Sequence, residues 1–190
     1  MPQRMSRRRF VLYSSLGFVV AVHDSFTPTE ASQTLAERSW RYCSSCGVLF
    51  HNGSGRGRCP NNPEGHAAAG FQFIIGYVSN GCVDDTPTKQ SRWRKCSKCL
   101  TMYYNGGDAT SKRCSAGGFH SRDDRKCYNL LVNRLHGPVL NPENEFMQGG
   151  WRFCGRCSAL FFNGYLDNKG VCPSGGAHAA LGDMFVLEHL

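Results

Sequence analysis

One pattern, Trp-Arg-x-Cys-x-x-Cys, occurs three times in this chain of 190 residues. It reads WRYCSSC at 40–46, WRKCSKC at 93–99 and WRFCGRC at 151–157, so the tryptophans are spaced 53 and 58 residues apart. A period of this length is typical of repeat architectures, in which copies too small to bury a core alone pack against one another. The repetition therefore predicts three similar units that share a core.

Each copy follows the same order of events. An apolar run ending in Asn-Gly follows the Cys-x-x-Cys pair, and a glycine-rich stretch, a third cysteine, a histidine and a last apolar run come next. Asn-Gly after aromatic residues is a hairpin signal, because both residues tolerate positive φ. The pattern predicts an all-β domain over 32–190, with a strand at each tryptophan, a tight Cys-x-x-Cys corner, a strand ending at Asn-Gly, a loop and a final strand. The copies are expected at about 40–78, 93–132 and 151–190.

The cysteines and histidines of each copy form a ligand set for zinc. A third cysteine follows each Cys-x-x-Cys after 12 to 14 residues, and a histidine follows it after five or six more. Three thiolates and one imidazole complete a tetrahedral zinc shell. We therefore expect three zinc ions, one per copy, with these predicted ligands: Cys43, Cys46, Cys59 and His66; Cys96, Cys99, Cys114 and His120; Cys154, Cys157, Cys172 and His178.

Disulfides are the main alternative use of these cysteines. An exported chain meets oxidants, but eleven cysteines cannot all pair within one chain, and disulfides give the recurring histidines no role. Cys82 and Cys127 lie outside the three sets, and they either pair or remain free, because sequence does not determine connectivity. Four histidines also have no counterpart in the other copies and are expected to be ordinary surface or half-buried groups: His23, His51, His136 and His189.

The predicted zinc sites are structural rather than catalytic. A four-ligand shell rich in cysteine has no open position for water or substrate. The chain also contains no His-Glu-x-x-His, no phosphate-binding glycine loop and no Gly-x-Ser-x-Gly. We therefore expect a protein that is not an enzyme.

The first 31 residues have the layout of an export signal and leader. The basic stretch RMSRRR precedes an apolar run over 10–22, which is too short to span a bilayer. The stretch SRRRFVL at 6–12 resembles the twin-arginine export motif, although Val11 and Leu12 depart from it. That resemblance implies export of an already folded, metal-loaded protein to an extracellular or periplasmic location; the alternative is a disordered basic tail.

The order Trp-x-x-Cys-x-x-Cys, Leu-Phe-Phe-x-Gly and Cys-Pro-x-Gly-Gly-x-His, over about 40–190, resembles a Cys/His repeat of secreted bacterial proteins of unknown role. Three β repeats of about 50 residues are also similar to a β-trefoil, whose copies share one barrel. The alternative fold is three tandem zinc-ribbon-like units.

Two binding functions follow from these features. The trefoil resemblance implies an extracellular ligand, with carbohydrate as the first expectation, and the aromatic residues near the Asn-Gly turns are either its contacts or core residues: Phe50, Tyr103, Tyr104, Phe161 and Phe162. The alternative partner is nucleic acid, because basic residues flank the ligand pairs and the repeat loosely resembles an RNA-binding class of zinc fingers: Arg41, Arg94, Lys95, Lys98, Arg152 and Arg156. The net charge of +8 permits an anionic partner without requiring one. The oligomeric state stays open.

Overall fold

The computed structural model describes residues 35–106, 112–122, 125–133 and 145–190. These residues all belong to one compact unit, residues 32–190. The predicted export signal and leader lie outside the described residues. None of the described residues belongs to a helix long and apolar enough to cross a membrane.

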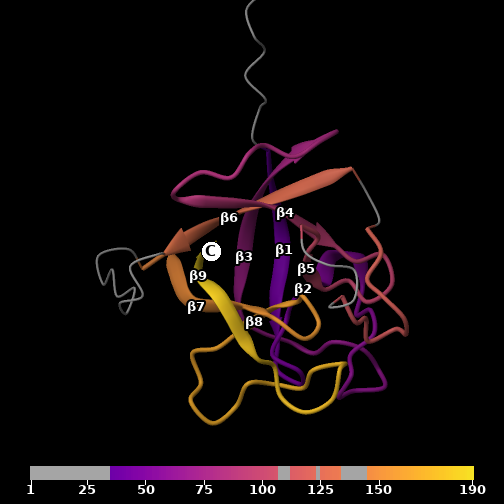
Figure 1. Ribbon diagram of the computed structural model, residues 1–190. Coiled ribbons are helices and arrows are strands. Elements are labelled where there is room, and N and C mark those ends of the chain that lie inside the picture. The colour runs from indigo at the N-terminus through magenta and orange to yellow at the C-terminus, as the bar shows by residue number, and fades with distance from the viewer. Residues whose placement is uncertain (1–34, 107–111, 123–124, 134–144) are drawn as a thin grey trace, which may run out of the picture. The chain divides into compact units, whose positions relative to one another are not determined.

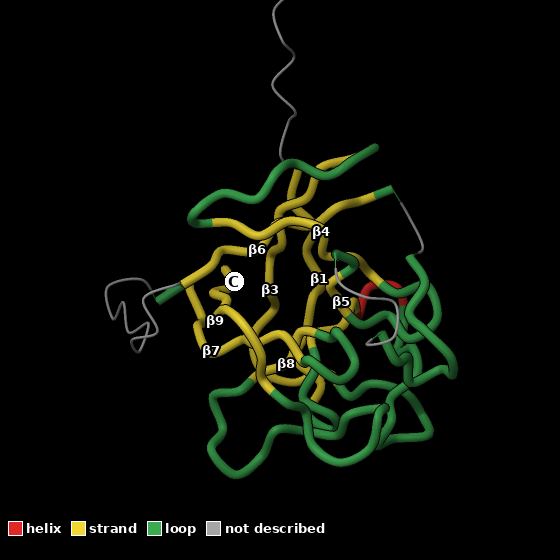
Figure 2. The backbone as a smooth tube through the Cα atoms, in the orientation of Figure 1, coloured by secondary structure: helices red, strands yellow, loops and turns green. Residues whose placement is uncertain are grey.

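Nine strands account for nearly all regular structure in the described part of the chain (Figures 1 and 2). Each copy supplies a long first strand, a three-residue second strand and a long third strand. A single turn of 3-10 helix, η1 (Asn52–Ser54), follows the second strand of the first copy. The strands are β1 (Leu35–Cys43), β2 (Leu49–His51), β3 (Ala68–Ser79), β4 (Lys89–Lys95), β5 (Met102–Tyr104), β6 (Lys126–Asn133), β7 (Met147–Cys154), β8 (Leu160–Phe162) and β9 (Ala180–His189).

Within each copy, the first strand pairs antiparallel with both other strands. Strand β1 pairs with β2 and β3, β4 with β5 and β6, and β7 with β8 and β9. The Cys-x-x-Cys pair forms the turn between the first two strands, which the sequence predicts as a corner. The residue after the second cysteine has positive φ in every copy, at 84° for Gly47, 64° for Leu100 and 62° for Ser158.

The Asn-Gly dipeptides do not form the predicted hairpins. In each copy, the second strand ends at the residue before the asparagine, and within the described residues it has no paired strand directly beyond the dipeptide. The hairpin lies instead at the cysteine pair, because the backbone turns there within six residues. At Asn-Gly, the chain leaves the second strand and enters the long loop that contains the third cysteine and the histidine.

Pairing between the copies closes the sheet into a barrel-like arrangement. Strands β3, β6 and β9 each pair with both of the others, using different stretches of each strand. The second strands are joined in the same cyclic way, by bridges between Val48 and Phe161, Phe50 and Thr101, and Tyr103 and Ala159. The copies are therefore parts of one structure and not the separate tandem units of the alternative prediction.

The shared core confirms this conclusion. One cluster of buried side chains draws on all three copies and contains Trp40, Trp93 and Trp151, each of which is fully buried. Trp40 packs edge-on against Tyr128, Trp93 against Phe185 and Trp151 against Phe73, so each ring contacts an aromatic residue of a third strand. Burial of such rings gives each copy several kcal/mol of hydrophobic stabilisation, at about 25 cal/mol per Å².

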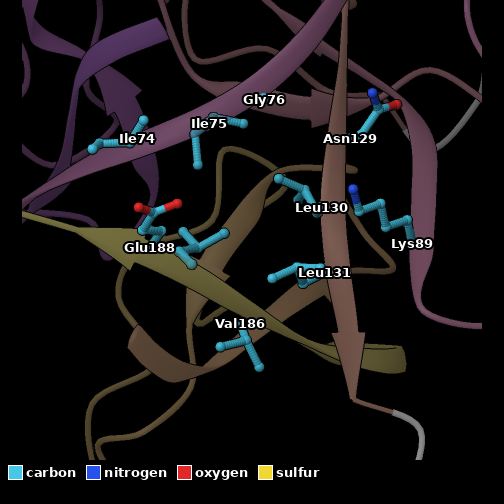
Figure 3. Close-up of a pocket in the computed structure, with 10 residues that line it drawn as sticks. Ile74, Ile75, Gly76, Lys89, Asn129, Leu130, Leu131, Val186 and Glu188 are labelled. Carbon is cyan, nitrogen blue, oxygen red and sulfur yellow. The ribbon is translucent and has the colours of Figure 1, made fainter. Parts of the chain in front are cut away.

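The three third strands surround a hollow of about 170 Å³. Figure 3 shows its lining, to which each of these strands contributes three consecutive residues and β4 contributes Lys89. Ile75, Leu130 and Leu187 also belong to the buried core, so the hollow lies against that core. Its lining is mainly apolar, with Asn129, Lys89 and Glu188 as the polar exceptions.

Candidate metal centres

The fold brings each predicted ligand set together. In all three sets, the three sulfurs and one imidazole nitrogen lie within 4.8 Å of one another. Eleven of the twelve side chains belong to buried residues, and the exception, His120, is partly buried. Each group can therefore hold a metal ion away from water.

The spacing of these atoms fits a tetrahedral ion. Bonds of about 2.3 Å to sulfur and 2.0 to 2.1 Å to nitrogen place two sulfurs about 3.8 Å apart, and a sulfur and a nitrogen about 3.5 Å apart. In the first site, the sulfurs of Cys43 and Cys59 are 4.0 Å apart, and Cys46 Sγ lies 3.4 Å from His66 Nδ1. The corresponding distances are 3.8 and 3.4 Å in the second site and 4.0 and 3.5 Å in the third.

A tight turn at the Cys-x-x-Cys pair builds part of each site, and a second tight turn completes two of the three. At the first turn, the backbone N–H of Cys43 bonds to Val48 O, and the N–H of Gly47 bonds to Cys43 O; equivalent bonds occur in the other two copies. In the second and third copies, the other turn follows the third cysteine, where Cys114 N–H bonds to Gly118 O and Cys172 N–H to Gly176 O. The positive φ of the paired glycines in those turns explains why both copies have Gly-Gly before the histidine.

Each ligand histidine is held in a fixed orientation by an aromatic ring. Phe50 stacks on His66 with centroids 4.8 Å apart, Tyr103 on His120 at 4.7 Å and Phe161 on His178 at 4.9 Å. These three aromatic residues are buried. They are walls of the metal sites, so of the two roles that the sequence leaves open for them, ligand contact or core residue, the structure shows the second. Tyr104 and Phe162 pack against the core and are only partly exposed.

The buried thiols of each site need a nearby positive charge in order to ionise together. In the first site, hydrogen bonds from Cys46 and Cys59 lower the pKa of the Cys43 thiol, while the bond to Cys43 and burial raise the pKa of Cys46. Burial opposes ionisation of His66, but its hydrogen bonds and charge interactions with Cys43 and Cys59 raise its pKa to about 9. The Cys43 thiol therefore ionises easily, whereas the Cys46 thiol ionises only if a cation is present. A divalent metal ion supplies that charge for all the thiolates together.

The sites are linked to one another through their histidines. His66 Nε2 donates to the carbonyl oxygen of Cys99 in the second copy at 3.1 Å, and His178 Nε2 donates to that of Cys46 in the first copy at 3.2 Å. Metal-binding histidines commonly use the second ring nitrogen in this way, which fixes the tautomer and the orientation of the ring. Sequence spacing contains no sign of these bonds, because they join residues 33 and 132 positions apart.

The equivalent hydrogen bond from the second copy to the third is missing among the described residues. His120 Nε2 is buried and has no hydrogen-bond partner in the part of the chain that the structure describes. In the other copies, a glycine precedes the third cysteine by two positions and lies directly against the neighbouring carbonyl. A Cβ on Gly57 would lie 2.3 Å from Cys99 O, and one on Gly170 would lie 2.0 Å from Cys46 O. The second copy has Lys112 at that position, so its loop lacks the glycine that permits this approach.

The arginine of the repeated Trp-Arg pair has a structural role in every copy. Arg41 donates to Gly70 O at 3.0 Å, Arg94 to Lys126 O at 2.5 Å and Arg152 to Gly182 O at 2.9 Å. Each acceptor lies in the third strand of the same copy, so these bonds hold the first and third strands together. The basic residues within the turns act similarly, since Lys98 bonds to Gly117 O and Arg156 to Ser174 O and Ala177 O.

The remaining cysteines form a disulfide bond between Cys82 and Cys127. This bond resolves the alternatives that the sequence leaves open, and the other nine cysteines have no disulfide partner. Two of the histidines without counterparts, His51 and His189, are buried rather than surface or half-buried groups. His23 and His136 lie outside the described residues.

Comparison with protein-family models, with curated proteins and with solved structures finds no match to this chain.

Proposed function

We propose that this chain is an exported binding module whose β domain is held together by three structural zinc ions. The proposal rests on the three buried groups of three cysteines and one histidine, with spacings that fit a tetrahedral ion. Each group uses all four positions of such an ion, which leaves none for a substrate. In this proposal, Cys and His ligands stabilise the fold and take no part in chemistry.

Zinc is the proposed metal because of the ligand chemistry. Thiolates and imidazole together favour zinc over calcium or magnesium, which prefer oxygen. Zinc also has no redox chemistry of its own, which suits an ion whose role is structural. Metal binding to small zinc domains is worth an apparent 10 to 16 kcal/mol per site at neutral pH, so three ions dominate the stability of a domain of this size.

Export is proposed from the N-terminal sequence and is supported by the disulfide. A bond between Cys82 and Cys127 persists in an oxidising compartment. Nine reduced cysteines in the same chain need protection there, and coordination to zinc before export provides it. The cyclic pairing of three similar units is the support for a trefoil-type origin of the domain.

Carbohydrate is the proposed ligand class, and the loop after β8 is the proposed place for it. Tyr165 is half exposed, and its ring is braced edge-on by Tyr42 and Phe162 with centroids 6.2 and 5.1 Å away. Lys169 anchors the loop through the carbonyl oxygens of Tyr165 and Asn163. An open aromatic face beside the polar groups of Asp167 and Asn168 suits a sugar ring, with its apolar face on the tyrosine and its hydroxyls on the polar groups.

A polysaccharide panel tests this ligand proposal. The full chain should bind at least one polysaccharide, and Tyr165→Ala should abolish that binding while leaving the metal content unchanged. Phe119→Ala, which removes a similarly exposed ring elsewhere, is the matched control and should bind normally. Failure of all polysaccharides, or equal binding by the Tyr165 variant, would contradict the proposed ligand site.

Nucleic acid receives no comparable support from any specific observation. Five of the six basic residues that suggested it, all except Lys95, bond to backbone carbonyls of their own copy with their charged groups. Arg94 and Lys95 are themselves buried.

A further inference from the structure

The boundary between the first and second copies is polar where the other two boundaries are aromatic. At the boundary of the third and first copies, Tyr42 lies beside Phe162 and Tyr165; at that of the second and third, Phe153 lies beside Tyr104. At the remaining boundary, all of the equivalent residues are polar. Lys95 occupies the position of Tyr42 and Phe153, and His51 occupies that of Phe162 and Tyr104. Ser54 occupies the position of Tyr165.

The same boundary also breaks a repeated hydrogen bond. The indole N–H of Trp93 bonds to Gln90 Oε1 and that of Trp151 to Gln148 Oε1, both at 3.1 Å. The first copy has Glu37 at this position, and Trp40 Nε1 has no hydrogen-bond partner among the residues that the structure describes. Glu37 is directed instead to Lys126 and Tyr128 of the second copy. All three copies adopt the same fold, so a cluster of polar exceptions to the repeated residues points to a function.

These exceptions form a connected serine, histidine and glutamate. His51 Nδ1 lies 2.7 Å from Ser54 Oγ, and His51 Nε2 lies 3.5 Å from Glu37 Oε1. Lys126 Nζ, 2.7 Å from Glu37 Oε1, and the hydroxyl of Tyr128 hold the carboxylate in place. Lys95 Nζ donates to Ser54 Oγ at 3.3 Å. Ser54 itself is exposed on η1, so a reagent from solution can reach it.

The arrangement favours the neutral form of His51, with its proton on Nε2, which is the form that a general base requires. A proton on Nε2 faces the carboxylate of Glu37, which leaves the lone pair of Nδ1 to accept the serine hydroxyl proton. Burial lowers the pKa of His51, and the charges of Lys95 and Lys126 act in the same direction, against the opposite effects of Glu37 and of a backbone hydrogen bond with Arg38. The imidazole is therefore neutral at neutral pH.

We infer that Ser54 is an activated nucleophile that accepts acyl groups from small esters, with His51 as its base and Glu37 as the positioning residue. This inference goes beyond the proposed binding function and departs from the expectation that the chain is not an enzyme. In the step, Ser54 Oγ forms a bond to the acyl carbon as the bond from that carbon to the alcohol oxygen breaks. The hydroxyl proton passes to His51 Nδ1 and then to the departing alkoxide. Lys95 stabilises the negative charge that develops on oxygen during the attack.

Acetylation by p-nitrophenyl acetate tests the inference on the full, metal-loaded chain. Peptide mapping by mass spectrometry should find acetyl on Ser54, formed much faster than on Ser44, an exposed serine in the first Cys-x-x-Cys turn. His51→Gln should slow acetylation of Ser54 by at least about 100-fold, because a positioned base contributes about that much. Ser44→Ala should leave the rate at Ser54 unchanged.

The wild-type chain alone can overturn the inference. Acetylation of Ser54 no faster than that of Ser44, or acetyl groups on lysines only, would show an ordinary hydroxyl. An equal rate at Ser54 in the His51 variant, with zinc content and circular dichroism unchanged, would show that the histidine is a structural partner only. Failure of polysaccharide binding has no bearing on this result, because Ser54 and Tyr165 lie at different boundaries between copies.

Discussion

His66 Nε2 donates its hydrogen to the carbonyl oxygen of Cys99 at 3.1 Å, which joins the first metal site to the second cysteine of the second. His178 makes the same bond to Cys46, but His120 Nε2 has no hydrogen-bond partner among the described residues. The three sites thus have the same types of ligand at similar spacing, and they differ in the hydrogen bond of the histidine's second ring nitrogen. Outer partners of this kind affect metal affinity by about 10- to 100-fold.

The second site should therefore lose its metal first. With excess chelator, one equivalent per chain should leave about 10- to 100-fold faster than the other two, because His120 is not held through its second nitrogen. A metal-sensitive dye gives the rates, and alkylation with peptide mapping identifies the cysteines that are exposed first. Cys99 and Cys114 should react before Cys46 and Cys157. Simultaneous release of all three ions, or earlier release from another site, would contradict this order.

The glycine beside each linked carbonyl should be essential for local packing. Gly170→Ala places a Cβ 2.0 Å from Cys46 O at φ +68°, and we expect a loss of more than about 3 kcal/mol in the free energy of unfolding. Gly70→Ala is the matched control, since its φ of +65° is nearly the same but nothing lies within 4 Å. It should cost only the left-handed strain, about 1 to 2 kcal/mol. Equal losses in urea denaturation would show that the close approach is unimportant.

The disulfide should contribute stability that is independent of the metal. It joins residues 45 positions apart, so its removal in the Cys82→Ser, Cys127→Ser double variant should lower the free energy of unfolding by about 2 to 4 kcal/mol. The nine cysteines of the metal sites are not involved, so elemental analysis should find the same metal content as in the parent chain. A variant that also loses metal would show that the two kinds of cross-link depend on each other.

Removal of one ligand should empty one site. Cys157→Ser replaces a buried thiolate with a hydroxyl, a poor zinc ligand, and should reduce the metal content by about one ion per chain. Ser158→Ala, one residue away, alters no ligand and should retain full content. Loss of all three ions from the Cys157 variant would mean that the sites fill cooperatively rather than singly.

The repeat made the metal sites and the order of strands predictable. A recurring Cys-x-x-Cys, cysteine and histidine places four ligand atoms in every copy, and the long apolar runs at Phe73, Tyr128 and Phe185 indicate buried strands. The wrong prediction, a hairpin at each Asn-Gly, and the details that the sequence leaves open both concern what the pattern does not encode. Asn-Gly signals a turn but not which strands that turn connects, and alternation alone does not show that Phe50, Tyr103 and Phe161 stack on the ligand histidines.

The contacts between copies cannot be predicted from the sequence, for a related reason. The bonds from His66 to Cys99 and from His178 to Cys46 depend on how the copies pack around one another, and no local spacing reports it. One signal was present in the sequence, namely the departure of Glu37, His51 and Lys95 from the residues at the same positions in the other copies. Comparison of the copies position by position locates this polar boundary, although only the structure shows the short contact between His51 and Ser54.

The metal content of the purified full chain tests the central claim most directly. The chain should be prepared without chelator or added metal, and elemental analysis should be combined with mass spectrometry of the intact protein under native conditions. Three zinc ions per chain, with Cys82–Cys127 as the single disulfide, is the predicted result. Less than one equivalent of metal, with disulfides among the cysteines of the three sites, would contradict the account.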